Sequence, residues 1–224
     1  MSEKLKSLLV IYDSSIADRG RDSYLRAIKK QIPNVVLADV RISVDGIGYK
    51  QDYVLVLKPM SDKKYRQLNY QIRKLVPHKD IEGVHTGERL ALTALAIRDL
   101  IMIQYDSPDD IEDKTILIIN QSNVVGQPLA KELIDLGANV ININSKYEDL
   151  DNLLLFTKID VLVSASGDSN FNIDRYLTHK IDLKIDLSED LDDGDKITHV
   201  PTVKKLKERL LKWHTRNWKT ELQI

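Results

Sequence analysis

The fold of this chain is decided by residues 115–143, which read TILIINQSNVVGQPLAKELIDLGANVINI. Apolar, β-branched runs at 115–119 and 139–143 predict two buried strands. A helical pattern at 128–136 lies between them, and Gly137 stands where the C-terminus of a helix favours glycine. The stretch therefore predicts a β-α-β unit, in which a helix joins two parallel strands.

Further strand and helix patterns extend this unit in both directions. Apolar runs at 161–165 and 183–187 predict that the second half forms a doubly wound parallel sheet of the nucleotide-binding type. In the first half, strand-like runs alternate with helical patterns, which predicts a second α/β domain. The expected elements of that domain are strands at 7–12, 35–37 and 53–57 and helices at 22–32, capped by Asp22 and Ser23, and at 65–75.

Two more helical patterns bear on how the chain divides into domains. Apolar residues dominate 90–103, which predicts a long, mostly buried helix that ties two domains together. The charged, amphipathic pattern at 204–213 predicts a helix with one packed face. We therefore expect an N-terminal domain at 1–97, a nucleotide-binding domain at 98–203, and a C-terminal helix at 204–224 that packs back on the N-terminal domain.

Composition narrows the class of protein. The chain has 224 residues, 42% of them apolar, which is enough for one large or two small domains with cores. Its 33 Lys and Arg nearly balance 34 Asp and Glu, so no bulk charge favours a nucleic acid or a membrane as partner. Because cysteine is absent, no disulfide, thiolate zinc site or cysteine nucleophile is expected, and we predict no metal site. With no signal peptide or membrane span in view, we expect a cytoplasmic protein.

The loop that follows the strand at 115–119 is the first candidate binding site. It lacks the dinucleotide fingerprint G-x-G-x-x-G, but Asn120 tolerates positive φ, Ser122 offers a hydroxyl and Gly126 lets the backbone come close. A helix N-terminus such as the one at Pro128 attracts phosphate, and we expect its amides to bind a pyrophosphate. From the residues alone, nucleotide binding and a plain turn of the chain remain equal alternatives.

Several segments resemble one family in order and spacing. Residues 116–130, ILIINQSNVVGQPLA, resemble the segment of the methylenetetrahydrofolate dehydrogenase/cyclohydrolase family that reads roughly VVIGRSxIVGxPxA. Similar blocks are PHKDIEGVH at 77–85, ANVININSK at 138–146 and DVLVSASGDSNF at 160–171. The resemblance extends from Ser7 to about Leu211, and it suggests a divergent, shortened member of the family.

The resemblance implies a fold, an activity and a set of partners. The fold would be α/β, with an N-terminal α/β domain facing a Rossmann-like, doubly wound NAD(P)-binding domain. In the family, a hydride passes from 5,10-methylenetetrahydrofolate to the nicotinamide, and the methenyl product is then hydrolysed. The resemblance thus implies an oxidoreductase of one-carbon metabolism with NAD or NADP as cofactor, a folate or pterin substrate, and a homodimer.

The resemblance also implies site residues. Tyr24 matches the tyrosine of the family's catalytic helix, Glu82 replaces an aspartate that holds the pterin, and Thr93 matches a threonine of a further motif. A glutamine from a strand end falls on Val56 or Leu57, and we take Val56 as substrate-binding. The implied cofactor residues are Asn120, Gln121, Ser122, Val125, Gly126, Ser145, Ser166 and Gly167.

Departures from the family pattern suggest a change of chemistry. Ile28 stands where the family has a lysine that takes part in the hydrolysis, so we expect cyclohydrolase activity to be weak or absent. Gln121 stands where the family often has an arginine for the NADP phosphate, which favours NAD. The family's glycine-rich loop is missing at 199–204, where a helix begins at once. The alternative is a catalytically degenerate relative that binds a nucleotide or pterin as a regulator. We expect the acidic segment 186–195 to be a solvated loop.

Overall fold

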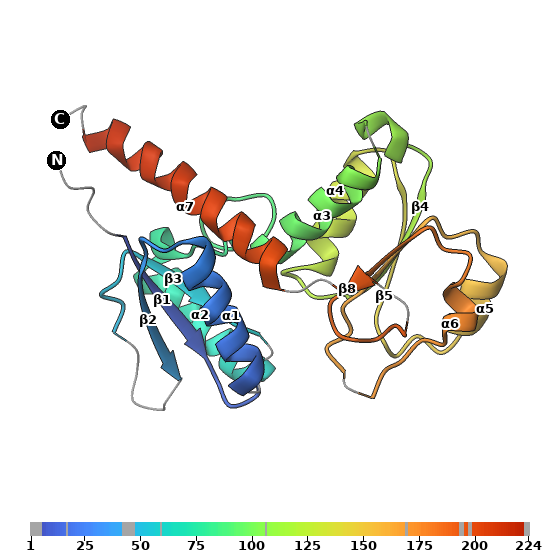
Figure 1. Cartoon of the computed structure of the whole chain (residues 1–224), viewed down its shortest axis with the longest axis horizontal. Coiled ribbons are helices and arrows are strands. Elements are labelled where there is room, and N and C mark those ends of the chain that lie inside the picture. Colours follow the sequence, from blue (N-terminus) through green and yellow to red (C-terminus); the bar gives the residue numbers. More distant parts are fainter. Residues whose placement is uncertain are drawn as a thin grey trace. The chain divides into compact units, whose positions relative to one another are not determined.

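The computed structural model shows two compact units (Figure 1). It describes residues 6–16, 18–41, 48–58, 60–105, 107–168, 170–192, 195–196 and 199–221. One unit consists of Met1–Leu92 together with Thr202–Ile224, and the other of Thr93–Pro201. The chain therefore passes between the units twice, and its C-terminal segment belongs to the same unit as its N-terminal segment.

The first unit is built on a three-stranded parallel sheet. Its strands are β1 (Ser7–Tyr12), β2 (Val36–Arg41) and β3 (Tyr53–Val56), in the order β2-β1-β3. Its helices are α1 (Asp18–Gln31), α2 (Asp62–Leu75) and α7 (His199–Glu221), with a 3₁₀ turn η1 at Pro77–Lys79. Helix α1 begins at Asp18, four residues before the expected cap at Asp22, and both aspartates form ion pairs with Arg21.

Alternation along the strands of this sheet separates two apolar layers. Leu8 and Val10 of β1 point to one face, where they join residues of α1 and α7 in a buried cluster. Leu9 and Ile11 point to the other face and pack with Leu68 and Ile72 of α2. Because side chains of a strand point alternately to opposite faces, one short apolar strand supplies both layers.

The second unit contains a five-stranded parallel sheet. Its strands are β4 (Thr115–Ile119), β5 (Asn139–Ile143), β6 (Val161–Ser164), β7 (Leu183–Asp186) and β8 (Asp195–Lys196), in the order β5-β4-β6-β7-β8. Its helices are α3 (Leu92–Gln104), α4 (Gly126–Asp135), α5 (Leu150–Phe156) and α6 (Arg175–Thr178), with a 3₁₀ turn η2 at Pro108–Ile111. This order confirms the predicted α/β class with a doubly wound parallel sheet.

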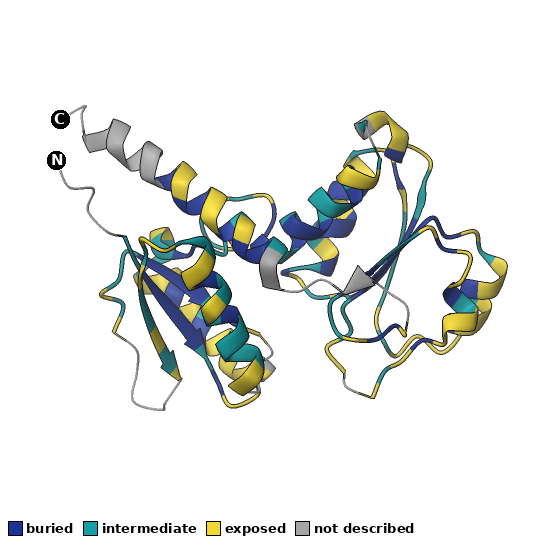
Figure 2. Cartoon of the chain, viewed as in Figure 1, coloured by how far each residue is buried: buried dark blue, intermediate teal, exposed yellow. Residues whose placement is uncertain are grey.

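The core of the second unit follows the same alternation. Leu117 and Ile119 of β4 belong to a buried cluster that includes Leu150 and Leu154 of α5. Ile116 and its alternating neighbours point to the opposite face and are also fully buried. Strands β1, β3, β4 and β6 are largely buried, whereas the edge strands β2 and β5 are partly exposed. Figure 2 shows the exposed edge at β2 and the largely exposed outer sides of α5 and α6. A sheet covered on both faces is typical of parallel α/β folds.

Helix α4, which follows the first strand of the second sheet along the chain, ends as the sequence predicts. Leu136 follows the last residue of α4, and Gly137 then takes a φ of +89°, a left-handed conformation that favours glycine. At its other end, α4 begins at Gly126, two residues before the expected start at Pro128. Within the part of the chain that the structure describes, no helix is long and apolar enough to cross a membrane.

Candidate functional site

The carboxyl ends of β4 and β6 form the point where the strand order of the second sheet reverses. Ligands of open α/β sheets bind in the crevice outside such a point. Asn120, which follows β4, donates from Nδ2 to the carbonyl oxygen of Ala165, which follows β6, at 2.7 Å. The side chain of Asn120 thus joins the two strand ends. The implied cofactor residues lie in the loops that follow β4, β5 and β6, except Gly126, which is the first residue of α4.

The loop from β4 to α4 is held by its own polar groups. Oδ1 of Asn120 accepts hydrogen bonds from the backbone N–H groups of Ser122 and Gly126, each at 3.0 Å. Oγ of Ser122 accepts from the N–H of Val125, and its carbonyl oxygen accepts from the N–H of Gln127. A Cβ on Gly126 would lie 1.6 Å from the carbonyl oxygen of Asn120, so only glycine fits this position.

These bonds correct one expectation about the helix N-terminus. The N–H groups of Gly126 and Gln127 are bonded to Asn120 and Ser122, Pro128 has no N–H, and the N–H of Leu129 is bonded to Val125. The amides that open α4 therefore already have partners inside the protein. A pyrophosphate at this edge would instead have to contact side chains or exposed backbone of the neighbouring loops.

Gln121 and Ser145 lie beside the end of β5. The side chain of Gln121 donates to the carbonyl oxygen of Asn142 at 2.9 Å and accepts from Nδ2 of Asn144 at 3.0 Å. Ser145 follows in the same turn and is half-buried, and Lys146 is exposed. The amide of Gln121 thus takes part in a neutral hydrogen-bond network at a position where the family often places a cation.

Ser166 and Gly167 follow β6 and lie beside two buried carboxylates. Oγ of Ser166 donates to Asp190 at 2.6 Å, and the same carboxylate accepts from Oγ of Ser164, also at 2.6 Å. Asp186 accepts from the N–H groups of Ser188, Asp190 and Leu191.

This network shows that the expected solvated acidic loop is wrong for Asp186 and Asp190, because they are 1% and 0% exposed. Both carboxylates serve the loops after β6 and β7 as hydrogen-bond acceptors. Gly167 has a φ of +68° with open space where a Cβ would stand, so its backbone is accessible. Among the implied cofactor residues, Gly167 and Gln121 are thus exposed and Ser145 is half-buried.

In the first unit, Tyr24 and Glu82 lie within electrostatic reach of each other. Tyr24 is 9% exposed and packs in the cluster between β1, β3 and α7. Burial, together with the nearby carboxylate of Glu82, raises the pKa of the Tyr24 hydroxyl, so this tyrosine is protonated at neutral pH. Tyr24, which the resemblance implied for the reacting centre, thus lies near enough to feel the charge of Glu82, which the resemblance implied for holding the pterin.

Glu82 lies where several charged groups meet. Burial and the neighbouring Asp80 raise its pKa to about 7, whereas Arg209, a hydrogen bond from the N–H of Leu92 and the cation of Lys58 act in the opposite direction. Leu92 is the first residue of α3, so Glu82 occupies the position at a helix N-terminus that favours an anion. A solvated turn carboxylate would have none of these contacts, and Glu82 is therefore a candidate binding group.

The other positions that the resemblance singled out are Val56 or Leu57, Ile28 and Thr93. Val56 packs with the α2 cluster, whereas Leu57 belongs to the cluster that contains Tyr24. Of the two positions that could replace the family's glutamine, only Leu57 shares the Tyr24 face, which argues against Val56. Ile28 is fully buried in the same cluster as Tyr24. Thr93 follows Leu92 and is the first residue of the second unit.

A groove of about 660 Å³ lies in the first unit, away from these residues. Lys6 and Asp52 directly precede β1 and β3, which places the groove at the amino ends of these strands. Its lining consists of Lys6, Asp52, Tyr53, Pro77, His78, Lys79, His85, Thr86, Glu88 and Trp213. Because Tyr24 and Glu82 are not among them, the groove does not coincide with the candidate site.

Sequence analysis missed three charged residues of these sites. Asp190 is bonded to serines of another loop, Lys58 lies with Nζ 3.8 Å from the centre of the Tyr65 ring, and Arg209 reaches the Glu82 loop from α7. Lys58 directly follows an apolar strand, which is a signal for a binding edge. Asp190 and Arg209 carry no such local signal.

The geometry defines the class of protein as an α/β protein in which a doubly wound, nucleotide-binding type of domain is joined to a second α/β unit. Residues 91–188 match the family described as "Tetrahydrofolate dehydrogenase/cyclohydrolase, NAD(P)-binding domain". This part of the chain is therefore similar to the NAD(P)-binding domain of that family. This finding confirms the resemblance seen in the sequence.

Known relatives and structures agree with this assignment. The chain is 33% identical over 106 residues to the bifunctional protein FolD of Macrococcus caseolyticus, covering 43% of this chain and 36% of that protein. It is 32% identical over 183 residues to FolD of Mycoplasma capricolum, covering 75% of this chain and 60% of that protein. The chain thus spans about a third to three fifths of these relatives.

A solved structure supports the fold over a longer range. The NAD-dependent 5,10-methylenetetrahydrofolate dehydrogenase of Saccharomyces cerevisiae aligns with a TM-score of 0.73 and 17% identity. The alignment covers 96% of this chain and 89% of that one. At this identity the likeness concerns the fold, and chemistry must be argued from the sites.

Proposed function

We propose that the chain is an NAD(P)-dependent 5,10-methylenetetrahydrofolate dehydrogenase of one-carbon metabolism, with weak or absent cyclohydrolase activity. The observation that carries this proposal is the match of residues 91–188 to the family's NAD(P)-binding domain, directly after a loop in which Glu82 bonds to the N–H of Leu92 at the start of α3. The reduced folate would bind in the first unit and the cofactor at the carboxyl edge of the second sheet.

The roles of the residues follow from their chemistry. When bound, the nicotinamide accepts a hydride from the methylene bridge. An ionised Glu82 can accept paired hydrogen bonds from the ring that carries this bridge, and the Tyr24 hydroxyl, held protonated, can donate one. Hydride transfer depends mainly on two partners held in register, so it tolerates the loss of an acid or base better than hydrolysis does.

The cyclohydrolase part of the proposal rests on Ile28. A fully buried isoleucine occupies the position of the family lysine, and no proton can be exchanged there. For the cofactor, the neutral amide of Gln121 supplies no charge to a 2′-phosphate, and we propose a preference for NAD. We also propose a cytoplasmic homodimer, as the resemblance implies, which light scattering of the purified chain would test.

A regulatory protein that binds a nucleotide or a pterin is the second candidate. Two observations favour it: the amides at the start of α4 have internal partners, and Ile28 replaces a reactive side chain by an apolar one. Amides that are already bonded and an apolar residue at position 28 would both weaken catalysis, while neither would disturb the fold.

An assay separates the two candidates. The full chain is mixed with 5,10-methylenetetrahydrofolate and either NAD or NADP, and reduced nicotinamide is followed spectrophotometrically. The dehydrogenase forms it with at least one cofactor, and faster with NAD. If none forms with either, while calorimetry shows that a nucleotide binds, the protein is the regulator.

A further inference from the structure

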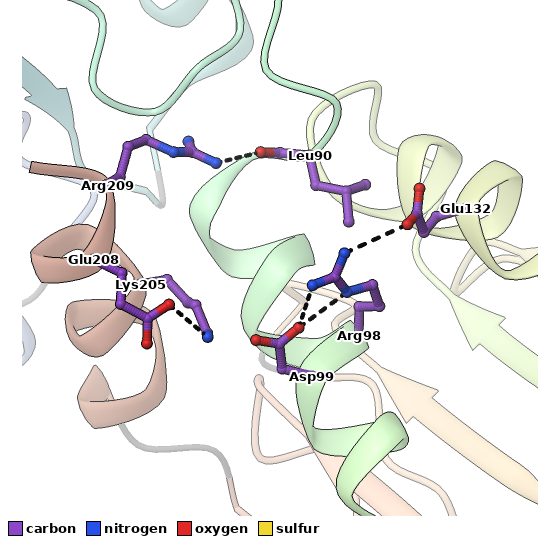
Figure 3. A network of polar contacts seen from close by, with 7 residues as sticks. All are labelled: Leu90, Arg98, Asp99, Glu132, Lys205, Glu208 and Arg209. Atoms are coloured by element: carbon purple, nitrogen blue, oxygen red, sulfur yellow. Dashed lines mark hydrogen bonds and ion pairs between the residues drawn. The ribbon is translucent and has the colours of Figure 1, made fainter. Parts of the chain in front are cut away.

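The C-terminal helix α7 contacts the loop that carries Glu82 through one buried arginine. Nη1 of Arg209 donates to the carbonyl oxygens of Ile81 and Glu82 at 3.1 and 2.6 Å. Nη2 donates to the carbonyl oxygen of Leu90 at 2.7 Å, a bond drawn in Figure 3. Arg209 is 5% exposed, so its fork is committed to these carbonyl groups, which lie on both sides of the loop.

The loop itself is shaped to receive the guanidinium group. Gly83 follows Glu82 with a φ of +92°, and a Cβ there would lie 2.7 Å from Nη1 of Arg209. Farther along the helix, Lys212 and Trp213 both bond to Glu88, at the other end of the loop. Arg209 thus bonds to both ends of the loop, including the carbonyl group of Glu82 itself, whereas Lys212 and Trp213 bond to Glu88.

The charge of Arg209 also acts on Glu82. Besides Arg209 on α7, the groups that face this carboxylate are Lys58 after β3, Asp80 in the same loop, Tyr24 on α1 and Tyr65 on α2. Arg209 is the first of the two cations in the strength of its effect, and it favours the ionised form of Glu82. The same side chain therefore governs both where the carboxylate lies and when it is charged.

We propose that Arg209 is a positioning residue for Glu82: by bonding the carbonyl oxygens of Ile81, Glu82 and Leu90, it holds the loop so that this carboxylate is aimed at the paired N–H donors of a reduced folate. The inference rests on the proposed function, because it takes a reduced folate as the ligand of Glu82. It adds that recognition of the folate in the first unit depends on a residue of the C-terminal helix, far along the chain from the loop.

The test is binding of tetrahydrofolate to the full chain, measured by calorimetry between pH 6 and pH 8.5. Wild-type affinity should rise with pH as Glu82 ionises. In Arg209→Gln the dissociation constant at pH 7 should increase by about tenfold or more, as expected when hydrogen bonds and a charge at a buried site are lost. The midpoint of its pH profile should move to higher pH, because a cation that favours the carboxylate is gone.

Two further variants keep the proposal open to refutation. Arg209→Lys retains the charge but cannot reach the three carbonyl groups, so it should lose affinity with little change of the midpoint. The matched control Lys212→Gln lies on the same helix and removes a contact with the same loop at Glu88, and it should change neither the affinity nor the midpoint. Lysine is a more conservative replacement for arginine than glutamine is, because it keeps the positive charge. If Arg209→Gln fails to fold, the test therefore uses Arg209→Lys.

The possible results separate this inference from the function on which it rests. Wild-type profiles in both Arg209 variants would overturn the inference alone. Equal losses in Arg209→Gln and Lys212→Gln would show that α7 merely supports the fold, which also overturns it. If the wild-type chain binds no tetrahydrofolate at any pH, the proposed function fails and the inference fails with it.

Discussion

Glu82 shows how a single carboxylate can be kept near its ionisation point by opposing neighbours. Burial and Asp80 favour the protonated form, whereas Arg209, Lys58 and the first N–H of α3 favour the charged form. The balance leaves the pKa at about 7, above the ordinary value of 4.5. A group of this kind stores free energy that depends on pH.

The pH dependence of stability should reveal this group. Between about pH 4.5 and 7 the native Glu82 binds more protons than the unfolded one, so its contribution to stability falls as the pH rises through this window. In Glu82→Gln that loss is absent. Relative to the wild type, the free energy of unfolding of the variant should therefore increase by on the order of 1 to 3 kcal/mol from pH 4.5 to 7. Above about pH 7.5 this difference should stay constant.

Urea unfolding at several pH values, followed by tryptophan fluorescence, measures this difference. Both tryptophans of the sequence, Trp213 and Trp218, belong to the first unit, so the signal reports that unit alone. The exposed Asp39 of β2, in the same unit, provides the control, and Asp39→Asn should not reproduce this change. A flat difference between Glu82→Gln and wild type would contradict the contacts assigned to Glu82.

Ile28 supplies a second prediction at the scale of the residue. Its side chain is fully buried in the cluster that contains Tyr24 and Leu57. Ile28→Lys would put a cation there without a partner, which should lower the free energy of unfolding by about 3 kcal/mol or more. The apolar control Ile28→Met should cost less than about 1.5 kcal/mol.

Fluorescence-detected unfolding of both Ile28 variants checks this, together with hydrolysis of the methenyl compound. If Ile28→Lys is as stable as Ile28→Met, position 28 does not belong to the core. A rise in hydrolysis in a folded Ile28→Lys would support the placement of this position at the reacting centre. Unchanged hydrolysis and hydride transfer would count against it.

At the scale of the residue, the sequence indicates which side chains are candidates for a site, but not which groups surround them in the fold. Tyr24 and Glu82 could be singled out because they belong to recognisable segments. Asp190 could not, because an acidic run normally indicates solvent exposure, and its partners Ser164 and Ser166 belong to another loop. The contacts that decide its burial are not local in sequence.

Among the elements, the junction between β4 and α4 depends on two features. One is the set of hydrogen bonds made by the side chain of Asn120, and the other is the close contact between the backbones of Asn120 and Gly126. Asn120 accepts from two backbone N–H groups of the loop and donates across to β6, so one side chain orders the loop and ties two strands. The absence of a Cβ at Gly126 lets the helix begin against the backbone of Asn120. This arrangement explains why α4 starts before Pro128.

Replacing Asn120 by alanine should therefore loosen the whole junction. Asn120→Ala leaves two N–H groups and one carbonyl oxygen without their partner, and it should destabilise the second unit by roughly 2 to 4 kcal/mol. The amide of Gly126 should exchange hydrogen faster in the native state. The control is Asn123→Ala, an exposed asparagine of the same loop, which should leave exchange and stability unchanged.

Hydrogen exchange followed by NMR, with thermal unfolding in parallel, measures both effects. Equal exchange at Gly126 in the two variants would mean that the Asn120 side chain does not hold the helix start. If NAD binding is also lost in Asn120→Ala alone, the ordered loop is needed for the cofactor.

The elements also show which parts of the fold can be predicted from local sequence patterns. The four longer strands of the second sheet and the end of α4 at Gly137 could be predicted, because apolar runs and a glycine stop are local signals. Helix α6 and strand β8 have four and two residues, which is too short for a periodic pattern to emerge. Their presence depends on packing and strand pairing with distant segments.

For the whole molecule, the decisive feature is that the chain returns to its first unit. Val203, Leu206, Leu210 and Trp213 of α7 belong to the same buried cluster as Leu8 and Leu55. The amphipathic pattern of this helix predicts a packed face, but not its partners, because Arg209 bonds to residues more than a hundred positions earlier. The expected return of this helix to the N-terminal domain named no contact residue.

This return makes the two units unequal in their response to truncation. Deleting residues 202–224 removes four large side chains from the core of the first unit, whereas the second unit lies wholly within Thr93–Pro201. Each such side chain contributes about 2 to 5 kcal/mol when it is lost from a core, so the first unit should unfold. The second unit should stay folded and retain NAD(P) binding, while tetrahydrofolate binding disappears.

Hydrogen exchange by mass spectrometry tells the two units apart in one sample. In the truncated chain, protection should vanish in β1 and persist in β4, since these strands are central in the two separate sheets. A chain that ends at Glu221 keeps the described helix and should behave as the full chain does. Loss of protection in β4 as well would show that the second unit needs the first in order to fold, because the two strands share no sheet through which one could stabilise the other.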